Sequence, residues 1–77
     1  MNEPSKWSGL FVREKVGSQG SYGFVNEDRG EEVLVFWKLP DGAYSRGESR
    51  KSRLDIVSPS PELEAWVKSR KLDQLVK

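Results

Sequence analysis

Short apolar runs separated by polar turns fill most of the chain, and several alternate apolar and polar positions with the period of a β-strand. Residues 7–16 predict a first strand with a kink or bulge at Gly9, followed by a glycine-rich loop at residues 17–21. Residues 22–26 predict a second strand, which a turn over residues 26–30 closes. This arrangement favours a mainly β fold.

The clearest strand covers residues 32–39, because this segment is rich in β-branched and aromatic residues and is apolar on both faces. We therefore expect it to be the central strand of a sheet. The proline, aspartate and glycine at residues 40–42 are typical of a tight hairpin, so a fourth strand is expected to begin at Ala43. That strand runs into residues 46–53, which are too polar for a core. Residues 54–57 then predict a brief fifth strand.

A helix is predicted to start at about Pro61. Ser60 suits the N-cap, proline suits the first turn, and Glu62 and Glu64 lie at the positive end of the helix dipole. The apolar residues fall on two roughly opposite sides: Leu63, Trp66 and Val67 first, then Leu72, Leu75 and Val76. The apolar face of the helix is therefore interrupted near Lys71. Either the helix bends there, or its second half presents an apolar edge to another molecule.

The composition allows one small domain and excludes several kinds of chemistry. The chain has 77 residues, of which 35% are hydrophobic and 32% charged, and it contains no cysteine or histidine. Disulfides, thiolate metal sites and catalysis by histidine-containing pairs are therefore excluded. We expect a flexible N-terminus at residues 1–6, a small β-barrel at residues 7–57 and a C-terminal helix at residues 58–77.

Charge is nearly balanced over the whole chain, with 13 basic and 12 acidic residues, but it is segregated along it. Residues 46–53 hold four basic side chains against one acidic, whereas residues 26–32 hold four acidic against one basic. On different faces of a barrel, these two segments would make a dipolar surface whose basic part can bind phosphate and release counterions. The alternative is that both runs are simply solvated.

The aromatic residues have to serve both the core and any binding platform. Phe24, Phe36 and Trp66 are expected in the core, because a domain this small has few other large apolar residues. Trp37 and Tyr44 flank the predicted hairpin and lie near the basic segment in the sequence, so they are candidates for stacking on bases. An acidic peptide would suit the same surface.

Several segments together resemble the Src-homology-3-like barrels of the Tudor and KOW kind. They are Gly20-Ser21-Tyr22-Gly23-Phe24-Val25, residues 30–37, Asp41-Gly42 and Leu54-Asp55-Ile56-Val57. The resemblance implies a small five-stranded barrel over roughly residues 9–57. A second resemblance, of residues 21–25 and 33–37 to the two nucleic-acid-binding motifs of cold-shock domains, implies exposed aromatic residues that stack on bases.

Together these observations predict a non-enzymatic binding module, built as a five-stranded Src-homology-3-like (SH3-like) barrel with a C-terminal α-helix. It is expected to contact nucleic acid (RNA or DNA), or an RNA–protein assembly, through a basic loop. The predicted nucleic-acid-binding residues are Arg46, Arg50, Lys51, Arg53, Trp37 and Tyr44. The alternative is a protein-interaction or regulatory subunit, or a homo-oligomer, that docks through Leu72, Leu75 and Val76.

No catalytic residue, cofactor or metal site is predicted, because the acidic residues lie in turn or edge contexts and lack the spacing of a calcium loop. The N-terminal sequence has no basic-then-apolar signal profile, and the longest apolar run, residues 33–37, is far shorter than a membrane-spanning helix. We therefore expect a cytoplasmic protein without a membrane partner.

Overall fold

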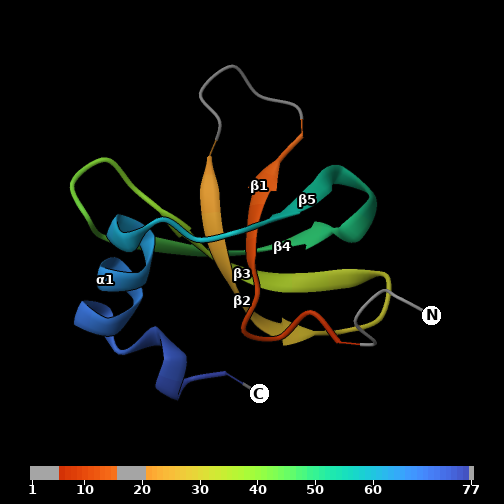
Figure 1. Cartoon of the computed structure of the whole chain (residues 1–77). Coiled ribbons are helices and arrows are strands. Elements are labelled where there is room, and N and C mark those ends of the chain that lie inside the picture. Colours follow the sequence, from red (N-terminus) through yellow and green to blue (C-terminus); the bar gives the residue numbers. More distant parts are fainter. Residues whose placement is uncertain (1–5, 16–20, 77) are drawn as a thin grey trace.

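The computed structural model describes residues 6–15 and 21–76, which form an antiparallel sheet and one C-terminal α-helix (Figure 1). The strands are β1 (Phe11–Glu14), β2 (Tyr22–Asp28), β3 (Glu32–Lys38), β4 (Tyr44–Arg50) and β5 (Leu54–Val57). The helical elements are the 3₁₀ turn η1 (Lys51–Arg53), the helix α1 (Pro61–Arg70) and the 3₁₀ turn η2 (Leu72–Gln74). The expectation of a mainly β domain with a C-terminal helix is confirmed.

The five strands lie in the order β4-β3-β2-β1-β5, and each neighbouring pair is antiparallel. β1 to β4 form a meander, and β5 returns to pair with β1, so that β4 and β5 are the two edges. β3 is an interior strand, as its two apolar faces require. It is not the middle strand, because the pairing of β5 with β1 adds a strand on the far side of β2.

The core consists of two apolar clusters, one on each face of the sheet. The cluster on the inner face contains Val12, Val25, Val33, Val35 and Leu54. The cluster on the outer face contains Phe24, Phe36, Leu63, Trp66, Val67 and Leu72, and it joins the sheet to α1 and η2. Since successive residues of a strand point to opposite faces, Val35 serves one cluster and Phe36 the other.

The first strand is shorter than predicted. Residues 7–10 form a turn, closed by a hydrogen bond between the Leu10 amide and the Trp7 carbonyl at 3.0 Å, with Gly9 at a φ of 82°. Strand β1 begins only at Phe11. Val16 and residues 17–20 of the predicted loop lie outside the described residues, as do residues 1–5 of the predicted flexible N-terminus.

β2 is longer than predicted, because it continues through polar residues that the sequence indicated as a turn. Val25 pairs with Val35 and Glu27 with Leu34, so Asn26 is an extra residue without a counterpart on β3. The bulge buries the Asn26 side chain, whose Oδ1 finds no hydrogen-bond partner among the described residues. The turn between β2 and β3 is correspondingly shorter.

The predicted hairpin between β3 and β4 is confirmed. The Leu39 amide donates to the Ala43 carbonyl at 2.9 Å, and the Gly42 amide donates to the Leu39 carbonyl at 2.9 Å. Asp41 Oδ1 accepts a hydrogen bond from the Ala43 amide at 3.0 Å. Gly42 has a φ of 90°, a conformation that favours glycine, so the sequence places this residue where the turn requires it.

The start and the break of the C-terminal helix are also confirmed. Ser60 Oγ accepts a hydrogen bond from the Leu63 amide at 3.2 Å, and Pro61 is the first helical residue. Lys71 ends the helix in the left-handed conformation, with a φ of 58°. This single residue turns the chain and starts η2, so the helix stops rather than bends.

The apolar edge predicted after the break does not exist as a surface. Because Lys71 redirects the chain, Leu72 joins the outer-face cluster and is fully buried, and Val76 packs against the same cluster. Only Leu75 remains exposed, at 46%. The prediction that Leu72, Leu75 and Val76 form one docking edge is therefore wrong.

In the part of the chain that the structure describes, no helix is long and apolar enough to cross a membrane.

Candidate binding surface

The predicted basic loop is not a loop. Arg46 and Arg50 belong to the edge strand β4, and Lys51 and Arg53 belong to η1. A polar strand is stable here because β4 pairs along its whole length with the apolar strand β3 and contributes only small residues to the inner face. The prediction is wrong because polarity does not exclude a strand at a sheet edge, which needs no continuous apolar face.

Lys51 is held inside the fold and is not available as a free cation. Its Nζ lies 2.9 Å from Asp28 Oδ2 and 5.3 Å from the centre of the Trp7 ring, and only 24% of its side chain is exposed. Asp28 also accepts hydrogen bonds from the amides of Trp7 and Gly30. Burial raises the pKa of the Asp28 carboxyl, but the contact with Lys51 and these two amides outweigh it, so the pKa is lowered from its ordinary value.

Replacing Asp28 with asparagine is expected to lower the free energy of unfolding by about 2 kcal/mol near neutral pH, because charge-assisted hydrogen bonds are lost and Lys51 loses its partner. The lowered pKa means that the contribution is complete above the unfolded carboxyl's pKa of 3.8 and disappears as pH falls through the folded value. Urea titrations at neutral and acidic pH measure the difference. A constant difference down to pH 2 would contradict the assignment.

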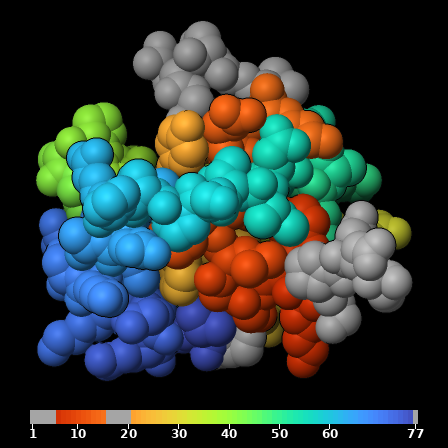
Figure 2. All heavy atoms as spheres, in the orientation of Figure 1, coloured from red at the N-terminus to blue at the C-terminus, as the bar shows by residue number. Residues whose placement is uncertain are grey.

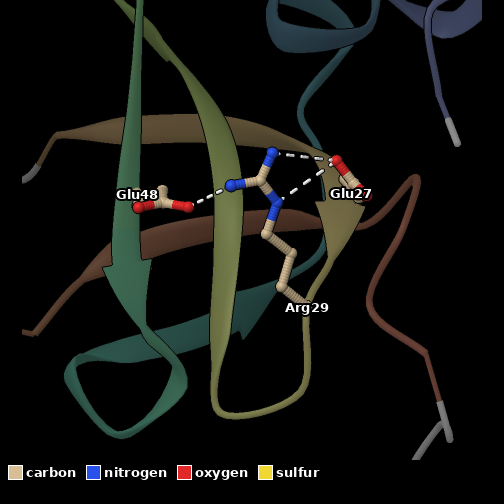
Figure 3. Close-up of polar contacts among 3 residues, drawn as sticks. All are labelled: Glu27, Arg29 and Glu48. Atoms are coloured by element: carbon tan, nitrogen blue, oxygen red, sulfur yellow. Dashed lines mark hydrogen bonds and ion pairs between the residues drawn. The ribbon is translucent and has the colours of Figure 1, made fainter.

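The acidic and basic segments lie side by side instead of on different faces. Arg29, in the turn after β2, reaches across β3 and binds Glu27 on β2 and Glu48 on β4 (Figure 3). Its guanidinium pKa is raised, first by the hydrogen bond to Glu27 and its charge and then by Glu48. Arg50 lies 3.9 Å from Glu32. The predicted dipolar surface is therefore wrong, because the two segments largely neutralise each other.

The two predicted stacking residues lie on opposite faces of the sheet. Trp37 is half-buried against the inner-face cluster, where its ring approaches Gly23 so closely that an added Cβ would lie 2.9 Å from Cε3. Tyr44 is on the outer face, packs edge-on against Phe36 at a ring-centroid distance of 5.0 Å, and is 41% exposed. Trp37 is therefore a core residue, whereas Tyr44 remains a candidate for binding.

Tyr44 belongs to a row of side chains that crosses three strands on the outer face. Lys38 on β3 pairs with Tyr44 on β4. Gly23 pairs with Trp37, so the next antiparallel position places Tyr22 on β2 beside Lys38. Tyr22 is 38% exposed. We call these three residues, Tyr22, Lys38 and Tyr44, the tyrosine–lysine row.

An open groove adjoins this row. It has a volume of about 580 Å³ and lies between the start of β2, the β3–β4 hairpin and the connection from β5 to α1, segments that meet on the face seen in Figure 2. Tyr22 and Lys38 line the groove together with Leu39, and Ser58 and Ser60 line it as well. The lining therefore offers an aromatic ring, a cation and hydrogen-bonding groups.

The charges around the row favour an anionic ligand. Among the described residues, neither Lys38 nor Arg46, which follows Tyr44 on the same face of β4, has an ion-pair partner. By contrast, Arg13, beside Tyr22 on β1, is occupied by Asp55 at 3.5 Å. Glu62 in the first turn of α1 is the acidic residue that lines the groove.

The structure thus brings together only part of the predicted nucleic-acid site. Tyr44 and Arg46 lie at the tyrosine–lysine row. Arg53 is exposed but lies on η1, together with Lys51, at the opposite end of β4. Sequence reasoning missed Lys38, although the hairpin that it correctly predicted at residues 40–42 already places Lys38 opposite Tyr44.

Comparison of the chain with protein-family models, with curated proteins and with solved structures finds no match.

Proposed function

We propose that this protein is a non-enzymatic module that binds single-stranded nucleic acid on the outer face of its sheet. The observation that carries the proposal is the tyrosine–lysine row, in which two exposed tyrosine rings flank a lysine that has no ion-pair partner among the described residues. Arg46 adds a second cation at one end of the row. The proposed binding surface does not include the other predicted basic residues, Arg50, Lys51 and Arg53.

The chemistry of the row fits a single strand better than a duplex. Neighbouring strands are about 4.8 Å apart, so the two tyrosines stand about 10 Å apart with the lysine between them. Unpaired bases can stack on the rings while the lysine contacts a phosphate. Bases in a duplex are stacked on one another, and their faces are not available to the tyrosines.

We also propose that the five strands form an SH3-like barrel of the Tudor or KOW kind. The meander of β1 to β4, the 3₁₀ turn η1 and the return of β5 to β1 support it. α1 packs on the outer face through Trp66, which also bonds the hairpin at Gly42, while Tyr22 and Tyr44 remain 38% and 41% exposed.

Fluorescence anisotropy with labelled oligouridylate and oligodeoxythymidylate tests the proposal. Tyr44→Ala and Tyr22→Ala are each expected to weaken binding by about tenfold, since stacking on one aromatic ring contributes about 1–3 kcal/mol per base. Lys38→Gln is expected to weaken binding and to reduce the slope of log affinity against log salt by about 0.7, the value for one lost single-strand phosphate contact. The two oligonucleotides show whether RNA or DNA is preferred.

Two further variants separate a binding effect from damage to the fold. Arg53→Gln removes an exposed cation far from the row and is expected to leave affinity unchanged. Glu62→Gln removes the negative charge beside the groove and is expected to raise affinity at low salt, an effect that unfolding cannot produce. Equal losses for Arg53→Gln and Lys38→Gln, or no binding by the original protein at low salt, would contradict the proposal.

A further inference from the structure

The backbone edge of β4 is open. The Leu39 amide bonds the Ala43 carbonyl, and the Lys51 amide bonds the Glu31 carbonyl. These two bonds fix the alternation of the antiparallel pair, so the odd-numbered residues of β4 bond to β3 and the even-numbered ones direct their amides and carbonyls away from the sheet. Among the described residues, no backbone group bonds to those of Tyr44, Arg46, Glu48 and Arg50 on this edge.

The side chains along this edge have a self-complementary order. The even-numbered residues occupy the outer face in the order Tyr44, Arg46, Glu48, Arg50. The odd-numbered residues are small, with Gly47 in the middle and a serine on either side. In an antiparallel pair centred on Gly47, each Arg46 faces Glu48 of the partner subunit and each Tyr44 faces Arg50 of the partner subunit.

We propose that two copies of this chain pair through β4 in this register and form one continuous sheet across a two-fold axis at Gly47. Pairing satisfies the outward amides and carbonyls with up to about eight main-chain hydrogen bonds. It also adds two ion pairs and two contacts of arginine with an aromatic ring. The small residues add no bulky β4 side chain to the inner face, where the Trp37 ring of each copy lies beside Gly47.

The neighbouring registers are disfavoured by charge. Centring the pair on Arg46 places two arginines opposite each other, and centring it on Glu48 places two glutamates opposite each other and Arg46 opposite Arg50 of the partner subunit. Like charges directly opposite on a sheet are destabilising. Contacts within one copy do not prevent the proposed register, because Glu48 has a second oxygen besides the one that binds Arg29.

Sedimentation equilibrium over a range of protein concentrations, without nucleic acid, tests the proposal. The original protein is expected to dimerise. R46E and E48R are each expected to weaken the dimer by tenfold or more at low salt, because positions 46 and 48 of the two copies then carry four charges of the same sign. A mixture of R46E and E48R is expected to form a heterodimer, since every facing pair is then of opposite sign. The double variant R46E/E48R restores the pairs and is expected to dimerise like the original protein.

R53E is the matched control, because Arg53 lies outside β4, and it is expected to leave the dimer unchanged. A protein that stays monomeric at millimolar concentration would overturn the proposal. Failure of the mixture to associate more strongly than either single variant would overturn it as well. The two proposals share Tyr44 and Arg46 but can fail separately, because the test of the tyrosine–lysine row measures binding of oligonucleotides and this test measures self-association without them.

Discussion

Replacing Trp66 with alanine is expected to lower the free energy of unfolding by about 3–5 kcal/mol, the usual cost of truncating a large buried aromatic side chain. Trp66 is 6% exposed and packs with Phe24 and Phe36 in the cluster that joins α1 to the sheet. Its Nε1 also donates to the Gly42 carbonyl at 2.9 Å and ties the helix to the β3–β4 hairpin. One side chain therefore holds two parts of the molecule together.

Urea denaturation followed by far-ultraviolet circular dichroism measures this loss. A domain of this size has only a few kcal/mol of stability, so the titration of the alanine variant should include a stabilising salt such as sulfate. Trp66→Phe is the matched control, because it keeps most of the apolar contact and loses the hydrogen bond and part of the ring. Its loss of unfolding free energy is expected to be less than half that of Trp66→Ala. A Trp66→Ala variant as stable as the original protein would show that α1 does not pack on the sheet.

Leu72→Ala is expected to cost about 2–5 kcal/mol, the usual range for a fully buried leucine. Leu75→Ser is the matched comparison. Its side chain is 46% exposed, so its effect on stability is expected to stay within about 0.5 kcal/mol. The two leucines lie three residues apart, and the same denaturation experiment distinguishes them. A larger loss for Leu75→Ser than for Leu72→Ala would contradict the burial of η2 against the sheet.

The elements that sequence reasoning located well are those fixed by local chemistry. The apolar alternation at residues 54–57 gives β5 with its observed bounds. Ser60 caps α1, and the residues at 40–42 form the predicted hairpin. For the cap and the hairpin the deciding interaction lies within a few residues of the signal, so the sequence alone contains it. β5 pairs with the distant strand β1, but the alternation of its own residues marks its bounds.

The elements that it located badly depend on strand pairing and backbone conformation, which residue type and periodicity do not show. β4 is a strand because β3 pairs with it, and its own residues give little sign of this. The polar end of β2 stays in the sheet because a bulge at Asn26 resets its register. Leu72 was placed on the wrong side of the helix because Lys71 adopts a left-handed conformation, which side-chain periodicity cannot reveal.

The candidate site shows the same division. Tyr44 and Arg46 could be singled out by residue type. The sequence could not show that Lys51 forms an ion pair with Asp28, or that strand register places Trp37 and Tyr44 on opposite faces of the sheet. Charge segregation along a chain does not imply segregation in space, because antiparallel pairing brings distant segments together. The basic and acidic segments meet for this reason.

Nuclear magnetic resonance of the isotope-labelled protein, titrated with short oligouridylate and oligodeoxythymidylate at low salt, tests the proposed binding surface most directly. We expect the largest shifts in the ring resonances of Tyr22 and Tyr44 and in the side chains of Lys38 and Arg46, while those of Lys51 and Arg53 stay in place. Shifts centred on η1, or no shifts with either oligonucleotide, would contradict the proposed binding surface.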